Sequence, residues 1–430
     1  MIAQTAHRLR AQMEHFSGNL SRGLSKPLRR FVGEALQGIV GRQSVLLSEI
    51  ARSLNEPIAL IKTENRLSRN LAAESIRSVL QGALAHEASA RVQEQTLLIL
   101  DLSDVVKPYG QKMEYLARVR DGSTGEIADG YALTQVIAVE NQGREITPLY
   151  GDLFSSAAAD HISENEEILR AIGHVSRACP ERGVWVIDRG ADRGELFDEL
   201  VPRDKKKRFI IRLRKDRHLR SGELKAPVLD LARATALPYR QLIVREEKGE
   251  ERTLNLRYGV RSVRLPQHPQ VPLWLVVVEG FGQDPLMILT NVPTRRQEQS
   301  VWWIASAYLS RWRVEEAIRF IKQAYDLEDV RVRTYERLRN MTVLVTAAMY
   351  FTAVVLGTRI KLQILAARAI AAAKRFFGVP DFRYYAIADG IRELLQRHPR
   401  SGTPPSRAPS AQLSLVPLRK KWGNFWTIGS

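Results

Sequence analysis

Residues Tyr308–Lys322 read Tyr-Leu-Ser-Arg-Trp-Arg-Val-Glu-Glu-Ala-Ile-Arg-Phe-Ile-Lys, which is the pattern of an amphipathic helix. At about 100° per residue, four polar side chains fall within about 60° of one another: Tyr308, Arg311, Glu315 and Lys322. The opposite face is apolar and suited to burial. A solvated ion pair between Arg311 and Glu315 would explain part of this pattern, but two aspartates earlier in the chain favour a functional site.

Two short apolar runs earlier in the chain each end in an aspartate. Leu97–Leu100 leads into Asp101, and Gly183–Ile187 leads into Asp188. Continuous apolar runs of this length are typical of strands that are covered on both faces. In open α/β sheets, ligands bind at the carboxyl ends of the strands. The sequence therefore predicts two carboxylates at a ligand-binding sheet edge, with Glu315 as a third.

Three carboxylates from separate elements suit phosphodiester cleavage with two metal ions. This chemistry needs acidic oxygens that hold two divalent ions about 3.5–4 Å apart. Hard oxygen ligands favour Mg²⁺ or Mn²⁺, and bound ions would neutralise carboxylates whose repulsion otherwise raises their pKa values. Cys179 is the single cysteine and the eight histidines form no HExxH motif, which argues against a zinc enzyme.

The chain is strongly basic: its 430 residues include 65 Lys and Arg against 47 Asp and Glu, for a net charge of +18. A chain this basic most often binds a polyanion, and DNA or RNA is the first candidate. A positive surface that only confers solubility would have the same composition. No secretory signal is visible and the single cysteine permits no disulfide within the chain, so a cytoplasmic protein is expected. The sequence also has no phosphate-binding loop and no dinucleotide fingerprint.

Residues 1–90 have helical spacing throughout most of their length. A helical segment, a break at Asn55–Pro57 and a second helical segment follow one another. The second segment carries three basic residues on its polar side: Lys62, Arg66 and Arg69. This order is typical of a helix-turn-helix that reads a DNA groove. An ordinary helical bundle has the same spacing, so both interpretations remain open.

After the second aspartate, alternation places Arg208, Arg212 and Arg214 on one face of a predicted strand. These arginines would either be solvated on an edge strand or contact phosphates of a nucleic acid. Residues 215–295 are then rich in strand-like segments with Pro and Gly between them, which predicts a small inserted β region.

Met341–Gly357 is apolar but at the short limit for crossing a bilayer, and we interpret it as a buried core helix. An Ala- and Arg-rich helix is predicted near 362–377, and the Pro- and Ser-rich end as a flexible tail. The predicted organisation is a helical region (1–90), an α/β core (91–340), a C-terminal helical region (341–397) and the tail (398–430).

The residues quoted above resemble the IS4-like DDE transposases. The helix matches the Tyr-(2)-Arg-(3)-Glu-(6)-Lys signature of that family at every named position, and Asp101–Asp104 and Asp188–Arg193 look like its first two catalytic motifs. The resemblance covers roughly residues 32–350. It implies an α/β fold with an RNase H-like mixed-sheet core, interrupted by a β-rich insertion and flanked by helical N- and C-terminal regions. By the same resemblance, residues 1–90 would be a DNA-end-binding domain and residues 91–340 the catalytic core.

The resemblance also implies roles for individual residues. Asp101, Asp188 and Glu315 would ligate two Mg²⁺ ions, with Mn²⁺ able to substitute. Six side chains are expected to contact DNA, the first three near a flipped terminal base: Tyr308, Arg311, Lys322, Arg189, Arg212 and Arg214. Glu316 turns about 100° away from the functional stripe, so Glu315 is the expected ligand.

Three other positions have less direct counterparts in the family. Asp104 and Asp192 are expected to position other groups and not to bind metal. The stacking tryptophan of some relatives has no counterpart in 285–290, where Met287 offers an apolar contact instead; Trp302 or Trp303 is the other candidate.

The implied activity is that of an insertion-sequence transposase, which nicks the element ends by hydrolysis and then joins a 3′ hydroxyl to target DNA in a cut-and-paste reaction. Its partners would be inverted-repeat end DNA, target DNA and a second copy of the chain when two ends are paired, without a membrane. The expected location is a prokaryotic cytoplasm, at the nucleoid. The alternatives are an inactive DNA-binding protein derived from a transposase and a stand-alone RNase H-like nuclease.

Overall fold

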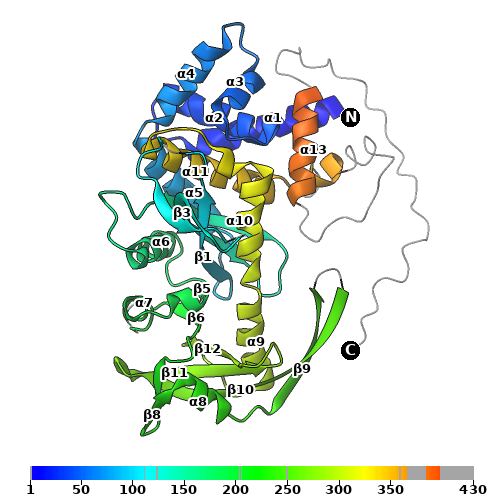
Figure 1. Ribbon diagram of the computed structural model, residues 1–430. Helices are drawn as coiled ribbons and strands as arrows, with labels where there is room; N and C mark the ends of the chain where they lie inside the picture. The colour runs from blue at the N-terminus through cyan, green and yellow to red at the C-terminus, as the bar shows by residue number, and fades with distance from the viewer. Residues whose placement is uncertain are drawn as a thin grey trace, which may run out of the picture.

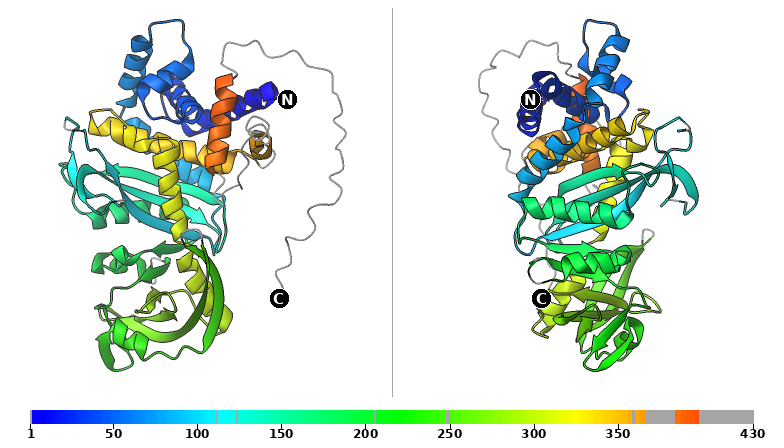
Figure 2. Two further views of the ribbon diagram at one scale, coloured as in Figure 1. Left: turned by 45° about the vertical axis from the view of Figure 1, so that its right-hand side comes forward. Right: turned by 90° about the vertical axis from the view of Figure 1, so that its left-hand side faces the viewer.

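The computed structural model describes residues 2–110, 112–122, 124–202, 204, 206–247, 250–357, 360–365 and 384–397. Helices form one end of the molecule, a helix-covered sheet lies in the middle, and a β-rich part forms the other end (Figures 1 and 2). The predicted helix near 362–377 lies outside the described residues beyond 365, and the predicted tail lies wholly outside them.

The middle sheet has the strand order and directions of an RNase H-like core. Its strands are β1 (Leu97–Val106), β2 (Ala117–Arg120), β3 (Ile127–Val139), β4 (Ile146–Phe154), β5 (Val184–Ile187) and β6 (Arg208–Arg212). β3 pairs antiparallel with β1, β2 and β4, while β1, β5 and β6 run parallel to one another. The predicted mixed-sheet α/β core is confirmed, although the sequence pattern did not predict β4.

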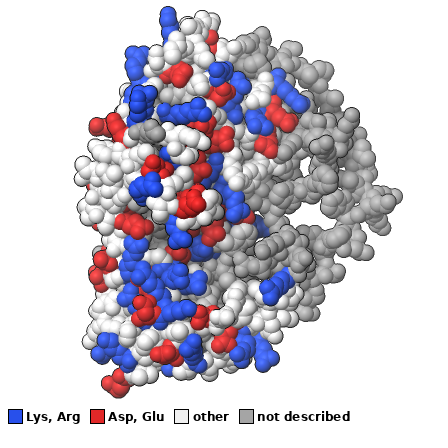
Figure 3. Space-filling model, in the orientation of Figure 1, with Lys and Arg blue, Asp and Glu red and all other residues white. Residues whose placement is uncertain are grey.

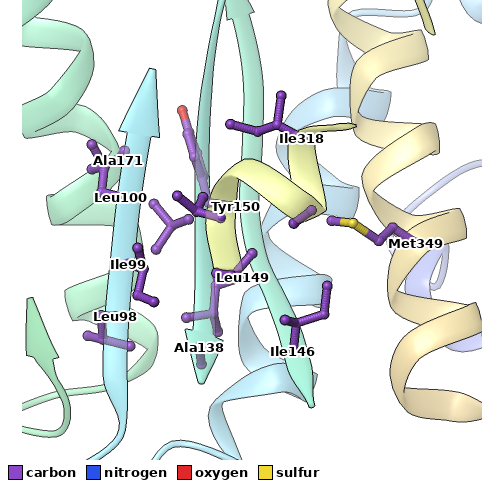
Figure 4. Close-up of a cluster of buried hydrophobic side chains, with 14 of the residues drawn as sticks. Leu98, Ile99, Leu100, Ala138, Ile146, Leu149, Tyr150, Ala171, Ile318 and Met349 are labelled. Carbon is purple, nitrogen blue, oxygen red and sulfur yellow. The ribbon is translucent and has the colours of Figure 1, made fainter. Parts of the chain in front are cut away.

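The apolar run in β1 is buried because helices cover both faces of the sheet. Ile99 points to one side of the sheet and Leu100 to the other, where Ala171 of α6 (Glu164–Ala178) lies (Figure 4). Gly183 precedes β5 with a φ of +81°, and a Cβ there would lie 2.6 Å from the Leu98 side chain. Glycine therefore lets β5 enter the sheet directly beside β1.

The β-rich insertion continues the core sheet and does not form a separate one. It contains β7 (His218–Ser221), β8 (Leu224–Pro227), α8 (Val228–Arg233), β9 (Tyr239–Glu247), β10 (Glu250–Leu265), β11 (His268–Glu279) and β12 (Leu286–Thr290). β12 pairs antiparallel with β6, so 12 strands share one sheet in the described part of the chain. The pattern predicted β9 to β12, but neither the short β7 and β8 nor this continuity.

The predicted helix Tyr308–Lys322 is divided between α9 (Glu298–Leu309) and α10 (Trp312–Ala324). The Ser310 hydroxyl donates to the Ser306 carbonyl at 2.9 Å and accepts from the Gln142 backbone N–H at 3.2 Å. Serine that bonds back to the preceding turn bends helices. The Arg311 N–H then bonds three residues back, to Tyr308, at 3.0 Å, so the turn is tightened while the chain direction continues (Figure 1).

The helical end contains α1 (Ile2–Leu20), α2 (Lys26–Arg42), α3 (Leu47–Leu54), α4 (Leu60–Leu71), α5 (Ser75–Ser89) and α13 (Tyr384–Arg397). α11 (Tyr335–Tyr350) and the following turn are apolar and long enough to cross a membrane by length and composition, but they are mostly buried inside the molecule. The predicted buried core helix is confirmed.

A buried ion network joins the helical end to the sheet. Asp152 of β4 is 3% exposed and accepts hydrogen bonds from Arg339 of α11 at 2.9 Å and from Arg77 of α5 at 3.2 Å. A buried carboxylate is tolerated when cations and hydrogen bonds compensate it. This network fixes α5 and α11 relative to the core.

Candidate active site

The register of two parallel strands brings Asp101 and Asp188 to the same edge of the sheet. Leu100 of β1 is the partner of Ile187 of β5, and the next residue on each strand is one of the predicted carboxylates. The Asp188 side chain accepts a hydrogen bond from the Gly190 N–H at 2.6 Å and so begins the short turn η1 (Arg189–Ala191). Asp188 follows the end of β5 as predicted, whereas Asp101 lies within β1, which continues to Val106. The two carboxylates therefore meet at the carboxyl end of β5, the kind of position where open α/β sheets bind ligands.

Arg311 connects this edge to α10. Its guanidinium donates through Nη1 to Asp101 Oδ2 at 3.0 Å and through Nη2 to Glu315 Oε1. The Arg311 and Asp101 side chains are 20% and 18% exposed, whereas Glu315 is 49% exposed. One cation therefore ties the first and third predicted carboxylates together, with the more open side at Glu315.

The three carboxylates act on one another electrostatically. Burial raises the pKa of Asp101 to about 7; the Arg311 charge opposes this rise, and the negative charges of Asp188 and Glu315 add to it. In such surroundings a nearby cation stabilises the charged form of the carboxylate. The rise in the Asp101 pKa is consistent with three acidic groups placed at one site.

The donor set fits a divalent cation, although the three groups do not form a finished cluster. Within the described residues, no three acidic, histidine or cysteine side chains are close enough to hold a metal ion. At Asp101 and Glu315, the Arg311 guanidinium bonds to the oxygens that a metal would use. Carboxylate oxygens are the ligands that Mg²⁺ prefers, so the donor atoms of Asp101, Asp188 and Glu315 suit such an ion in kind.

Tyr308 lies next to this site but is mostly buried. Burial raises the pKa of its hydroxyl, while the nearby Arg311 and Arg212 act against that rise, and Arg212 also donates a hydrogen bond to it. Arg212 at the end of β6 is thus joined to the site through Tyr308.

Two of the candidates for the contact with a flipped base are packed within the protein. Met287 is buried in β12, and Trp302 packs on Tyr258 with ring centroids 5.3 Å apart.

Lys322 is held by two carboxylates in this conformation. Its Nζ lies 3.1 Å from Asp104 Oδ2 and 3.1 Å from Glu328 Oε1. Asp104 also accepts a hydrogen bond from the Gly122 N–H at 3.1 Å. Asp104 therefore positions Lys322 and the β2–β3 connection. Sequence reasoning missed Glu328 because it follows the signature helix and has no fixed spacing to β1.

Asp192 has a structural role next to the site. It is fully buried, and it accepts hydrogen bonds from the Arg214 backbone N–H at 2.7 Å and from Arg217 Nε at 2.5 Å. These bonds hold the segment after β6 against η1. Together the two segments line a groove of about 560 Å³, formed by Asp188, Arg189, Gly190, Arg214, Lys215 and Asp216. Sequence reasoning missed Arg217, Lys215 and Asp216, for which the only signal was proximity to Arg214.

The predicted face of three arginines on one strand is wrong. β6 ends at Arg212, so Arg214 lies beyond it, in the segment that Asp192 holds. Arg208 lies at the opposite end of β6 and donates to the Glu94 carbonyl at 2.6 Å. Arg189 and Arg214 are exposed beside the groove. The structure therefore brings Arg189, Arg212 and Arg214 to the site and keeps Arg208 away from it.

The central strands of this RNase H-like sheet carry Asp101 within β1 and Asp188 directly after β5, a placement that suits metal-dependent chemistry on phosphodiesters. Residues 156–351 match the family described as transposase DDE domain. This part of the chain is thus similar to a transposase DDE domain, and such a domain implies a metal-dependent enzyme that cleaves DNA and transfers strands. The matched residues include Asp188 and Glu315, and Asp101 precedes them.

No curated protein matches the chain in sequence. Among solved structures, the chain is similar to a piggyBac transposase synaptic complex with hairpin DNA, with a TM-score of 0.43 and 11% sequence identity. The similarity covers 91% of this chain and 78% of the other. A likeness this distant adds nothing to the assignment of the site.

Proposed function

We propose that the chain is the transposase of an insertion sequence of the IS4-like type. It would hydrolyse phosphodiester bonds at the element ends and then join the freed 3′ hydroxyl to target DNA in a cut-and-paste reaction. The observation that carries this proposal is the convergence of Asp101 and Asp188 through the β1–β5 register, with Arg311 linking Asp101 to Glu315.

Asp101, Asp188 and Glu315 would hold two divalent ions, Mg²⁺ or Mn²⁺. When bound, such ions activate the attacking oxygen and stabilise the leaving one. The chain's own contribution is positioning: Arg311 exchanges its carboxylate partners for a DNA phosphate, which charge-assisted hydrogen bonds favour. Tyr308 and Lys322 are proposed to hold the same DNA end, and Arg189, Arg212 and Arg214 the adjoining backbone.

The surface supports DNA as the partner. Lys and Arg side chains are concentrated on one face over the region where β6 and α7 (Gly194–Leu200) lie (Figure 3). Positive surfaces of this kind bind phosphates through counterion release. We propose that end and target DNA bind across this face, that residues 1–90 bind the ends, and that two copies pair the two ends in a prokaryotic nucleoid.

The test is DNA cutting at the borders of the element. A plasmid that carries the DNA flanking the gene is incubated with purified full-length protein in Mg²⁺ or in EDTA, and cut ends are mapped on sequencing gels. Asp188→Ala and Glu315→Ala are run beside Glu316→Ala as the matched control. Mg²⁺-dependent cuts at the borders that only the first two variants abolish support the proposal. DNA binding without cuts, or cuts that no variant changes, would overturn it.

A further inference from the structure

The α2–α3–α4 unit holds α4 at the surface of the helical end. The three helices pack on one another, and α3 and α4 lie at the end of the molecule away from the β-rich part (Figure 1). α4 buries one side of its cylinder, with Thr63, Leu67 and Leu71. Its other side is exposed along the whole helix, and the residues there are Ile61, Lys62, Asn65 and Arg69.

A hydrogen-bonded ion network fixes α4 on this unit. Arg66 donates to Glu34 of α2 at 2.5 Å and to Glu56 at 2.8 and 2.9 Å. Glu56 also accepts from Thr63 at 2.7 Å and from Arg30 of α2 at 2.8 Å. Burial acts against the Glu56 charge, but hydrogen bonds from Thr63 and Arg66 lower its pKa. Networks in which most members are bonded hold their elements in one orientation.

The exposed face of α4 is outside this network. Among the described residues, no partner bonds to the side chains of Lys62, Asn65 or Arg69. Ile61 is 59% exposed and Ile58, just before the helix, is 50% exposed. Two exposed isoleucines thus lie beside polar side chains that have no partner within the described part of the protein, so this face is available to a ligand with both polar and apolar groups.

The four side chains match the chemistry of base edges in the major groove. Asn forms paired hydrogen bonds with adenine, Arg does so with guanine, and an apolar side chain contacts the thymine methyl group. Asn65 and Arg69 are one helical turn apart, or about 6 Å along the axis, which is about two base-pair steps. Lys62, at the edge of the face, reaches the phosphate backbone.

We propose that α4 is the recognition helix of this protein and reads the element ends through Asn65 and Arg69, with Ile61 on a thymine methyl and Lys62 on a phosphate. The proposal rests on the proposed function, which supplies the end DNA as ligand. The sequence pattern alone grouped Arg66 with Lys62 and Arg69 on the polar side of this helix. Arg66 is a structural residue, and Asn65 takes its place in readout.

The test uses full-length protein in EDTA, so that no cutting occurs, and duplexes with a random central segment as probe. Bound duplexes are sequenced to give a base preference at each position. Asn65→Ala is expected to remove an adenine preference and Arg69→Ala a guanine preference, each by about 5- to 150-fold. Arg69→Lys is expected to weaken the guanine preference less than Arg69→Ala while keeping most of the affinity, because the Lys ammonium can reach the guanine edge but lacks the planar fork of Arg.

Lys62→Ala is expected to weaken all sequences equally and to reduce the salt slope of binding by about 1. Arg331→Ala, which removes one charge from a residue that is 74% exposed outside this unit, is the matched control and is expected to change no base preference. Unchanged preferences in the Asn65 and Arg69 variants, or no sequence preference in the wild type, would overturn the proposal.

Cutting in Mg²⁺ separates the two proposals. If the wild type selects a sequence through Asn65 and Arg69 but cuts no element border, the recognition helix stands and the proposed function fails. If it cuts the borders while both variants keep the wild-type preference, only the recognition helix is wrong.

Discussion

Replacing Arg311 by Gln should strengthen divalent-metal binding by the protein without DNA. In the structure Arg311 bonds to Asp101 and Glu315, so a metal ion must displace it from both. The bond to Asp101 is partly buried and is between charged groups, which corresponds to about 1.5–3 kcal/mol. The bond to Glu315 is half exposed and adds little, because solvent screens such pairs. The expected gain in affinity is therefore roughly 10- to 150-fold.

The assay is calorimetric titration of the DNA-free protein with Mn²⁺. Arg257→Gln is the control, since Arg257 also pairs with a carboxylate but lies in the β-rich insertion, away from the three carboxylates. It should leave the affinity at the wild-type value, and thermal melting should show that both variants are folded. An Arg311→Gln affinity equal to or weaker than that of the wild type would refute the idea that Arg311 competes with the metal.

Three other predictions concern catalysis and stability. Glu315→Gln should reduce Mg²⁺-dependent cutting by more than the roughly 10- to 100-fold typical of outer-shell partners. Glu316→Gln should retain cutting, because the Glu316 carboxylate is paired with Arg313 on the same helix; equal losses in a gel assay would reject this choice of ligand. Asp152→Asn leaves the buried Arg339 and the partly buried Arg77 poorly compensated and should lower the free energy of unfolding by about 3–5 kcal/mol, as measured by urea titration; a change below 1 kcal/mol would show that the network is dispensable. Gly183→Ala forces a Cβ toward Leu98 at positive φ and should lower the melting temperature through about 1–3 kcal/mol of strain; an unchanged melting temperature would contradict the tight β1–β5 approach.

The carboxylates could be predicted from the sequence because local patterns place them. The buried runs before Asp101 and Asp188 have the continuous apolar character of central parallel strands, and the helix period puts Glu315 beside Arg311. Even the break at Ser310 leaves this face intact, because the Arg311 N–H bonds three residues back and the chain direction continues.

Tertiary contacts decided the features that could not be predicted. The pairing of β12 with β6 depends on two segments about 80 residues apart, and no local signal shows that the insertion extends the core sheet. On α4, helical spacing cannot tell Arg66 from Arg69, since both are basic and lie on the polar side. Only the glutamates of α2 and of the preceding turn show that Arg66 is bonded within the protein.

The central claim is that Asp101, Asp188 and Glu315 together bind divalent metal ions at the DNA-cutting site. A crystal structure of the full-length protein with end DNA and Mn²⁺, recorded at a wavelength where manganese scatters anomalously, tests it most directly. We predict anomalous peaks in contact with all three carboxylates, and Arg311 bonded to a DNA phosphate instead of to Asp101. Peaks bound elsewhere, or by Glu316 in place of Glu315, would contradict the account.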